Sequence, residues 1–311
     1  MNHLKPRLKA AVCLALCTLF GAGLFPAGSG APARAAGISF KATRPTPVVQ
    51  DFKVYLSPSA QPWNAYCDSS GGEEAHMRPI AAAVSRYLYQ YGIHSVIGAP
   101  HSGPRSSQKR EIEARVKQAQ ANHCNLYLAI HSNAKDGGPK TKGTTIFYPS
   151  KGGPSLRFAN LLKDNFIYPD KSAVSTETKD ALWEMYMPPM PHCLIETAYH
   201  DDPQDAQWIE SDIDGIAQNL AHSIALYAYV PVSVSMDQKS MTAKAGKTRD
   251  LTATVTLINH EISKNLTVWS TSNSGVAQVK NGTVYGVRRG TAVITARTSN
   301  YIKASCRVTV S

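Results

Sequence analysis

The sequence predicts an α/β domain, with a mixed, largely parallel sheet flanked by helices, followed by an Ig-like β-sandwich. Apolar strand-like runs alternate with amphipathic helical segments between residues 53 and 230, which is the pattern of a parallel sheet covered by helices. Helical periods disappear after Pro231, and short β-rich runs separated by turn residues fill 231–311. The 311 residues, 43% of them hydrophobic, suffice for two packed cores.

Residues 1–36 have the order of a secretory signal peptide. Lys5, Arg7 and Lys9 precede an uncharged run from Ala10 to about Phe25, and small residues then lead to Ala36. The apolar run is short for a membrane span and is followed by an Ala-x-Ala site. We therefore expect cleavage, a secreted, cell-wall-associated mature protein without a membrane span, and a linker over residues 37–52.

The charge of the mature chain favours acidic partners. Removal of residues 1–36 takes away four cations and lowers the net charge from +11 to +7. A basic exported protein suits anionic wall polymers. Nucleic acid is disfavoured because the cations are scattered and no nucleic-acid-binding motif occurs. The four remaining cysteines permit disulfides but are spaced too widely for a structural zinc site.

The elements of residues 53–230 follow one another in a βα pattern. A strand at Lys53–Leu56 runs into a turn-rich loop, and Gly71-Gly72 precede a helix from about Glu73 to Tyr91. The later strands are expected at His94–Gly98, Leu126–Ile130, Gly143–Tyr148 and Cys193–Glu196; the later helices at Ser107–Asn122, Ser155–Asn165 and Trp208–Tyr229; and a loop or short helix at Lys179–Met190.

Residues 231–311 contain seven expected strands and no catalytic cluster. Turn residues such as Asn281-Gly282 separate the strands. A module of this kind normally serves as a binding unit or as a spacer. The strands are expected at Val232–Met236, Leu251–Leu257, Thr267–Ser270, Val276–Val279, Thr283–Val287, Ala292–Arg297 and Cys306–Val310.

Two of the strands in the first domain end in ionisable residues. The apolar run Leu126–Ile130 leads directly into His131, Ser132 and Asn133, and Cys193-Leu194-Ile195 leads into Glu196. The carboxyl ends of parallel strands are where α/β sheets place their chemistry, so we expect His131 and Glu196 to share a site. The alternatives are a histidine that only caps its strand and a glutamate that only forms a structural ion pair.

Residues 53–229 resemble the zinc-dependent N-acetylmuramoyl-L-alanine amidases of the type 3 family, and residues 232–310 resemble the bacterial Ig-like group 2 domain. Ile130-His131-Ser132-Asn133-Ala134 is similar to the family's Ile-His-x-Asn-Ala, whose His binds zinc. Leu194-Ile195-Glu196-Thr197 is similar to the strand that carries the general base. Gly71-Gly72-Glu73-Glu74 is similar to the helix start that supplies a Glu ligand.

The resemblance implies a zinc-dependent hydrolase of peptidoglycan. Its substrate bond would be the amide between the lactyl group of N-acetylmuramic acid and the L-alanine of the stem peptide. Zinc would be held by Glu73, with Glu74 as the close alternative, and by His131. Glu196 would take a proton from water and return it to the leaving amine. Asn133 would orient the loop or the substrate.

One position departs from the family pattern. The family's first zinc ligand is a His in Asp-Pro-Gly-His, whereas the aligned stretch here is Ser57-Pro58-Ser59-Ala60-Gln61, with Ala60 at the His position. Gln61 could replace that ligand through its amide oxygen, or His76 could do so from the helix face of Glu73. The third reading is a metal-poor site.

Two classes of function therefore stand at this stage. One is an exported, metal-dependent peptidoglycan amidase that carries an Ig-like module. The other is a non-catalytic cell-wall-binding protein on an amidase scaffold, and a metallopeptidase acting within the stem peptide is a weaker third. Glu184, Met185 and Met187 precede the Glu196 strand and could line a substrate groove, although methionines there more often pack.

Overall fold

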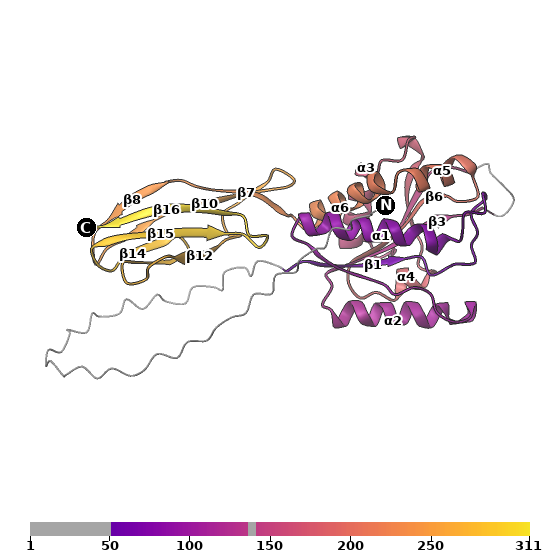
Figure 1. Ribbon diagram of the computed structural model, residues 1–311, viewed down its shortest axis with the longest axis horizontal. Coiled ribbons are helices and arrows are strands. Elements are labelled where there is room, and N and C mark those ends of the chain that lie inside the picture. The colour runs from indigo at the N-terminus through magenta and orange to yellow at the C-terminus, as the bar shows by residue number, and fades with distance from the viewer. Residues whose placement is uncertain (1–50, 136–140) are drawn as a thin grey trace, which may run out of the picture. The chain divides into compact units, whose positions relative to one another are not determined.

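The computed structural model describes residues 51–135 and 141–311 (Figure 1). The predicted signal peptide over residues 1–36 and all but the last two residues of the predicted linker lie outside the described residues. Among those described, no helix combines the length and the apolar character needed to cross a membrane. The four cysteines of this part of the chain, Cys67, Cys124, Cys193 and Cys306, are all free thiols.

A six-stranded sheet forms the centre of the first domain, in the order β2-β1-β3-β6-β4-β5. β1, β2, β3 and β6 pair in parallel, β4 is antiparallel to β6, and β5 is parallel to β4. The prediction of a mixed, largely parallel sheet is thus confirmed. The strands are β1 Lys53–Pro58, β2 His94–Ile97, β3 Leu126–Asn133, β4 Thr144–Tyr148, β5 Val174–Thr178 and β6 His192–Tyr199.

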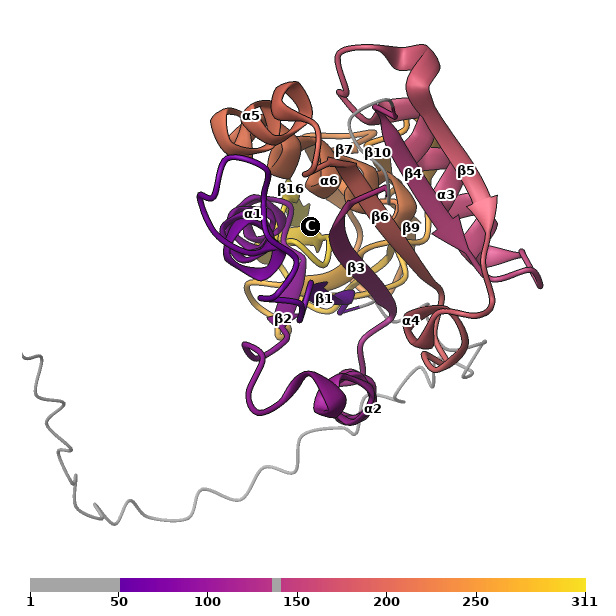
Figure 2. The same cartoon turned by 90° about the vertical axis from the view of Figure 1, so that its right-hand side faces the viewer.

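Helices cover both faces of this sheet (Figure 2). Apolar residues of α1, α3 and α6 pack on one face, and those of α2 and α4 pack on the other. The helices are α1 Glu73–Gln90, α2 Gln108–Ala121, α3 Pro154–Asn165, α4 Trp183–Tyr186, α5 Pro203–Ser211 and α6 Ile213–Tyr227, with short 3-10 turns at Arg105–Ser107 and Lys171–Ala173.

Strand β3 contributes to both cores, as its continuous apolar run requires. Leu128 and Ile130 belong to the core beneath α1, α3 and α6, whereas Tyr127 and Ala129 belong to the core beneath α2 and α4. Side chains alternate along a strand, so His131 projects toward the side of α2 and α4. A polar residue therefore continues an apolar face at the point where the strand leaves the core.

Two predictions about this domain need correction. The expected helix Trp208–Tyr229 is two helices, because Asp202 caps α5 at Pro203 and Asp212 interrupts the chain to cap α6. The Asp202 carboxylate accepts from the backbone N–H groups of Gln204 and Asp205, and the Asp212 carboxylate accepts from that of Gly215, as at ordinary N-caps. Strand β5 was not predicted, because it is a short, polar edge strand without an apolar run.

The C-terminal segment is all β, as predicted, but it has ten strands instead of the seven expected, in three sheets of order β11-β10-β7, β12-β15-β16-β8 and β13-β14-β9. The short strands β8, β9 and β11 were not predicted. Along β16 the buried residues Cys306, Val308 and Val310 alternate with exposed ones. The strands are β7 Pro231–Met236, β8 Ser240–Ala243, β9 Thr248–Asp250, β10 Ala253–Leu257, β11 Ile262–Ser263, β12 Val268–Thr271, β13 Ala277–Lys280, β14 Thr283–Gly286, β15 Gly290–Arg297 and β16 Lys303–Val310.

Candidate metal centre

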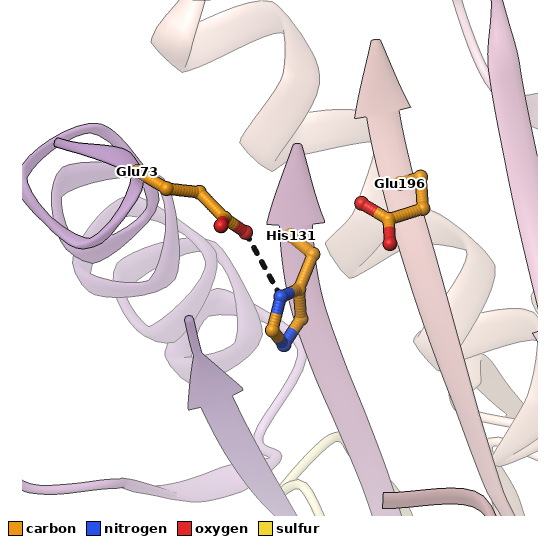
Figure 3. Close-up of side chains that lie close together, drawn as sticks. All are labelled: Glu73, His131 and Glu196. Carbon is orange, nitrogen blue, oxygen red and sulfur yellow. Dashed lines mark ion pairs between the residues drawn. The ribbon is translucent and has the colours of Figure 1, made fainter. Parts of the chain in front are cut away.

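Three ionisable side chains converge at the carboxyl edge of the sheet (Figure 3). His131 near the end of β3 and Glu196 on β6 are paired residues of two neighbouring parallel strands, so their side chains project from the same face. Glu73, the first residue of α1, reaches the His131 ring from the helix. The ligand atoms of these residues all lie within 4.8 Å of one another. The structure thus brings together the first-choice residues of the sequence interpretation.

Glu73 is almost completely buried and is tied to His131. Its Oε1 lies 2.9 Å from His131 Nδ1 and accepts a hydrogen bond of 3.1 Å from the backbone N–H of Ser132. Its Oε2 accepts from Asn64 Nδ2 at 2.8 Å. Burial raises the pKa of Glu73, but the imidazolium and these donors outweigh burial and hold it below its usual value. The carboxylate is therefore ionised and available to a cation.

The His131 ring is charged in the metal-free site. Burial alone lowers the pKa of His131, but the carboxylates of Glu73 and Glu184 outweigh it and hold that pKa well above its ordinary value. A metal must displace one ring proton to bind a nitrogen, so binding here is coupled to proton release.

A loop carrying Gln61 packs against the start of α1. The backbone N–H of Glu73 donates to Asn64 O at 2.8 Å, and a Cβ at Gly72 would lie only 2.1 Å from the carbonyl oxygen of Pro62. This close approach requires glycine and places Gln61 Nε2 3.4 Å from His131 Nδ1. The methyl side chain of Ala60 is buried and offers no donor atom.

Glu74 and His76, the other two candidate ligands, lie outside this group. Glu74 Oε1 accepts from the backbone N–H of His101 at 2.7 Å and lies 3.7 Å from Arg78. His76 stacks on Tyr66 with ring centroids 3.7 Å apart, and its Nε2 lies 2.9 Å from Glu210 Oε1.

Asn133 is the last residue of β3. Its backbone carbonyl accepts from the backbone N–H of His200 at 2.8 Å. This bond fixes the end of the strand two residues beyond His131.

Glu196 differs from Glu73 in having an unpartnered oxygen. Its Oε2 is sealed from solvent and finds no hydrogen-bond partner in the described part of the chain. Burial raises the pKa of Glu196 to about 7, with a further contribution from Glu73 that His131 and Lys179 partly oppose. A buried carboxylate oxygen without a hydrogen-bond donor is stabilised by protonation or by a bound cation.

The contact between Glu184 and His131 was not predicted from the sequence. Glu184 Oε2 lies 2.9 Å from His131 Nε2, on the side of the ring opposite Glu73, and the Glu184 side chain is buried. The expected role was to line a substrate groove. Residues 53 positions apart carry no local signal of such a pairing.

The donor set has the chemistry that zinc prefers. Imidazole nitrogen and carboxylate oxygen are standard zinc ligands, and one buried oxygen of the group finds no partner in residues 51–135 and 141–311. Glu73 and His131 would supply two ligands, and the Gln61 amide Nε2 lies 3.4 Å from His131 Nδ1. The residues present therefore fit a zinc ion.

Comparison with known proteins yields two family matches. Residues 66–226 match the family described as N-acetylmuramoyl-L-alanine amidase, and residues 232–308 match the bacterial Ig-like domain (group 2). Among curated proteins, the minor capsid protein of Enterobacteria phage T3 is 42% identical over 81 residues, which are 26% of this chain and 18% of that protein. The chain thus spans about a fifth of that relative's length.

Solved structures that resemble the chain include N-acetylmuramoyl-L-alanine amidases. The amidase AmiC2 of Nostoc punctiforme is 20% identical, with a TM-score of 0.49, over 57% of this chain and 97% of the other. The catalytic domain of CwlV from Bacillus (Paenibacillus) polymyxa var. colistinus is also 20% identical, with a TM-score of 0.49, over 58% of this chain and 99% of the other.

Proposed function

Because the chain belongs to the N-acetylmuramoyl-L-alanine amidase family, we propose that it is an exported, zinc-dependent hydrolase of peptidoglycan. The bond it cleaves is the amide between the lactyl group of N-acetylmuramic acid and the L-alanine of the stem peptide. The observation that carries this proposal is the convergence of Glu73, His131 and Glu196 within 4.8 Å at the carboxyl edge of the sheet.

The metal site consists of Glu73, His131 and Gln61. Glu73 is ionised and buried, and His131 directs Nδ1 toward it. Gln61 takes the place of the missing family histidine, with its amide rotated so that the oxygen faces the group. Zinc bound there supplies a Lewis acid that polarises the substrate carbonyl and lowers the pKa of water toward ~7.

Glu196 acts as the general base and then as the general acid. Its Oε2, which has no partner on the described chain, accepts a proton from the attacking water. The water oxygen bonds to the carbonyl carbon, the C–N bond breaks, and Glu196 returns the proton to the departing amine of L-alanine. The pKa of about 7 suits this exchange, because the carboxyl group can both accept and release a proton near neutral pH.

The Ig-like domain holds the protein on anionic wall polymers. Residues 231–311 contain eleven lysines and arginines and only three acidic residues, so the excess positive charge of the mature chain is concentrated there. Arg297, Lys303 and Arg307 are exposed on the sheet β12-β15-β16-β8, whose strands contain no acidic residue. Exposed Ser and Thr side chains accompany them, which suits a polymer of phosphodiester-linked polyols or sugars.

Export and a wall location follow from the same proposal. The cations, apolar run and small residues of 1–36 support a cleaved signal peptide. The substrate bond lies in the cell wall, so the mature protein works outside the membrane.

The test is digestion of purified peptidoglycan with the mature chain, followed by mass spectrometry. We expect stem peptides that begin with an unblocked L-alanine, beside intact glycan strands. Glu196→Gln should lower the rate by about 10²–10⁴-fold, the usual contribution of a general acid–base group. Glu177→Gln, at an exposed position of β5, is the matched control and should leave the rate unchanged. If the protein co-sediments with the wall but releases no peptides, the proposed activity is wrong, and the chain is a non-catalytic wall-binding protein on an amidase scaffold.

A further inference from the structure

A carboxylate lies next to each of the two ring nitrogens of His131. Nδ1 faces Glu73 Oε1 and Nε2 faces Glu184 Oε2, each at 2.9 Å. A neutral imidazole carries one N–H, so the carboxylate that accepts this N–H determines which nitrogen is left for a metal. The two carboxylates differ in what else they contact, and this difference decides the assignment.

Glu184 is locked in place by donors other than His131. Its Oε1 accepts from Ser57 Oγ at 2.6 Å and from Tyr127 Oη at 2.7 Å. Ser57 Oγ in turn accepts from Arg115 Nη1 at 2.9 Å, and Glu184 and Arg115 are 3% and 5% exposed. Both oxygens of Glu184 therefore accept from donors, and the Oε1 donors belong to a buried network of Ser57, Tyr127 and Arg115.

Glu73 also accepts from two further donors, Asn64 Nδ2 and the backbone N–H of Ser132, but its carboxylate lies in the group that includes Glu196, whose Oε2 has no partner in the described part of the chain. Glu184 is not a member of that group. The nitrogen that faces Glu73 therefore also faces the metal centre, whereas the nitrogen that faces Glu184 points into a buried hydrogen-bond network.

We propose that Glu184 is the positioning residue of the metal centre: it accepts the Nε2–H of His131 and so leaves Nδ1 as the metal ligand. This inference rests on the proposed function, since it assigns a role toward the zinc ion of that same site. A carboxylate behind a ligating histidine fixes the tautomer and the ring orientation and increases the basicity of the ligand nitrogen. Arg115, Ser57 and Tyr127 serve this role by holding the Glu184 carboxylate against the ring.

The test compares zinc affinity and histidine tautomer in the full mature chain. Replacing Glu184 by Gln keeps the volume but removes the charge, and we expect zinc binding to weaken about 10–100-fold, as for other partners behind metal ligands. Zinc affinity is measured by competition with a chromophoric chelator at fixed pH. In the zinc-loaded wild type, ¹⁵N–¹H NMR correlation should show the proton of His131 on Nε2.

A control is available at a second, half-buried carboxylate–histidine pair. Glu111 Oε2 lies 2.7 Å from His101 Nδ1, and Glu111 Oε1 accepts from Ser107 Oγ at 3.0 Å, outside the metal centre. Glu111→Gln should therefore leave zinc affinity unchanged. If E184Q does not fold, Tyr127→Phe, which removes one donor to Glu184, should still weaken zinc binding several-fold.

The outcomes separate this inference from the proposed function. Unchanged zinc affinity in E184Q, or a proton on Nδ1 in the wild type, would overturn the role of Glu184 while amidase activity stands. A wild type that binds zinc but releases no stem peptides would overturn the proposed function, and the E184Q affinity would still decide the inference. A wild type that binds no zinc would overturn both.

Discussion

His131 and Glu196 are paired residues of the adjacent parallel strands β3 and β6, so a cationic ring shares one face of the sheet edge with a carboxyl group whose Oε2 has no hydrogen-bond partner among the described residues. Glu73 and Glu184 already take up both ring nitrogens. Glu196 is therefore left as a third acid in a buried space that holds one positive ring. This arrangement raises the pKa of Glu196. An ionised Glu196 therefore destabilises the folded protein when no metal is bound.

The first prediction concerns the effect of Glu196 on the stability of the fold. The pKa of Glu196 is about 7 in the folded protein and 4.5 in an unfolded chain, so the folded state holds the proton more tightly. The stability that this provides is present below pH 4.5 and is lost as the pH rises to about 7. In the metal-free protein, Glu196→Gln should therefore be more stable than the wild type at pH 8, by about 3 kcal/mol at most, and about equal at pH 4.

The measurement is denaturant unfolding of both proteins at the two pH values, with a chelator present. The difference between them isolates Glu196, because other titrating groups are shared. A stability gap of the same size at pH 4 and pH 8 would show that the substitution acts through packing and not through the proton.

The second prediction concerns the residue that replaces the family histidine. Gln61 Nε2 lies 3.4 Å from His131 Nδ1, so the side chain at this position reaches the metal centre. An imidazole is a far better zinc ligand than an amide. Gln61→His should tighten zinc binding at least tenfold, and Gln61→Ala should weaken it. Ala60→His, one residue earlier in the same loop, is the comparison: its side chain is packed inward, and we expect loss of stability without tighter zinc binding.

Equal zinc affinity of the wild type, Q61H and Q61A would show that position 61 is not a ligand position. The third ligand would then have to come from elsewhere, with Glu196 the nearest carboxylate of the group.

The parts of the site that the sequence predicted are those with a local signal. His131 and Glu196 each follow an apolar strand run directly, and parallel pairing brings such positions to one edge. The glycines before Glu73 and the carboxylates in the first turn indicated a helix start, and the resemblance to the amidase family then pointed to Glu73 as a ligand. These cues depend only on neighbouring residues, which is why they could be read without a structure.

The missed parts depend on contacts between distant segments. Glu184 contacts His131 because α4 packs against β3, and the local sequence of neither segment predicts this contact. The choice between Gln61 and His76 depended on how one loop packs on α1, which Gly72 and Pro62 determine. The break between α5 and α6 had a local signal, the capping Asp212, but the continuous apolar pattern concealed it.

The third prediction concerns Gly72. A Cβ at this position would lie 2.1 Å from the carbonyl oxygen of Pro62, so Gly72→Ala must push the loop of Gln61 and Asn64 away from Glu73. We expect a lower melting temperature and weaker zinc binding, because Asn64 no longer orients Glu73. Gly275→Ala is the control, since its nearest contact is a side-chain atom at 3.3 Å in the Ig-like domain. Normal zinc affinity in G72A would mean that the loop does not shape the metal centre.

The fourth prediction concerns the exposed cations of the sheet β12-β15-β16-β8. Replacing Arg297, Lys303 and Arg307 by Gln should reduce binding to walls that retain phosphodiester polymers, and the remaining binding should depend less on salt. Walls stripped of these polymers should bind the wild type and the triple variant alike. The matched control removes three cations from exposed positions of α2, Lys109, Arg110 and Lys117, and should bind as the wild type does. Equal loss in both variants would point to net charge, and not to this sheet, as the determinant of wall binding.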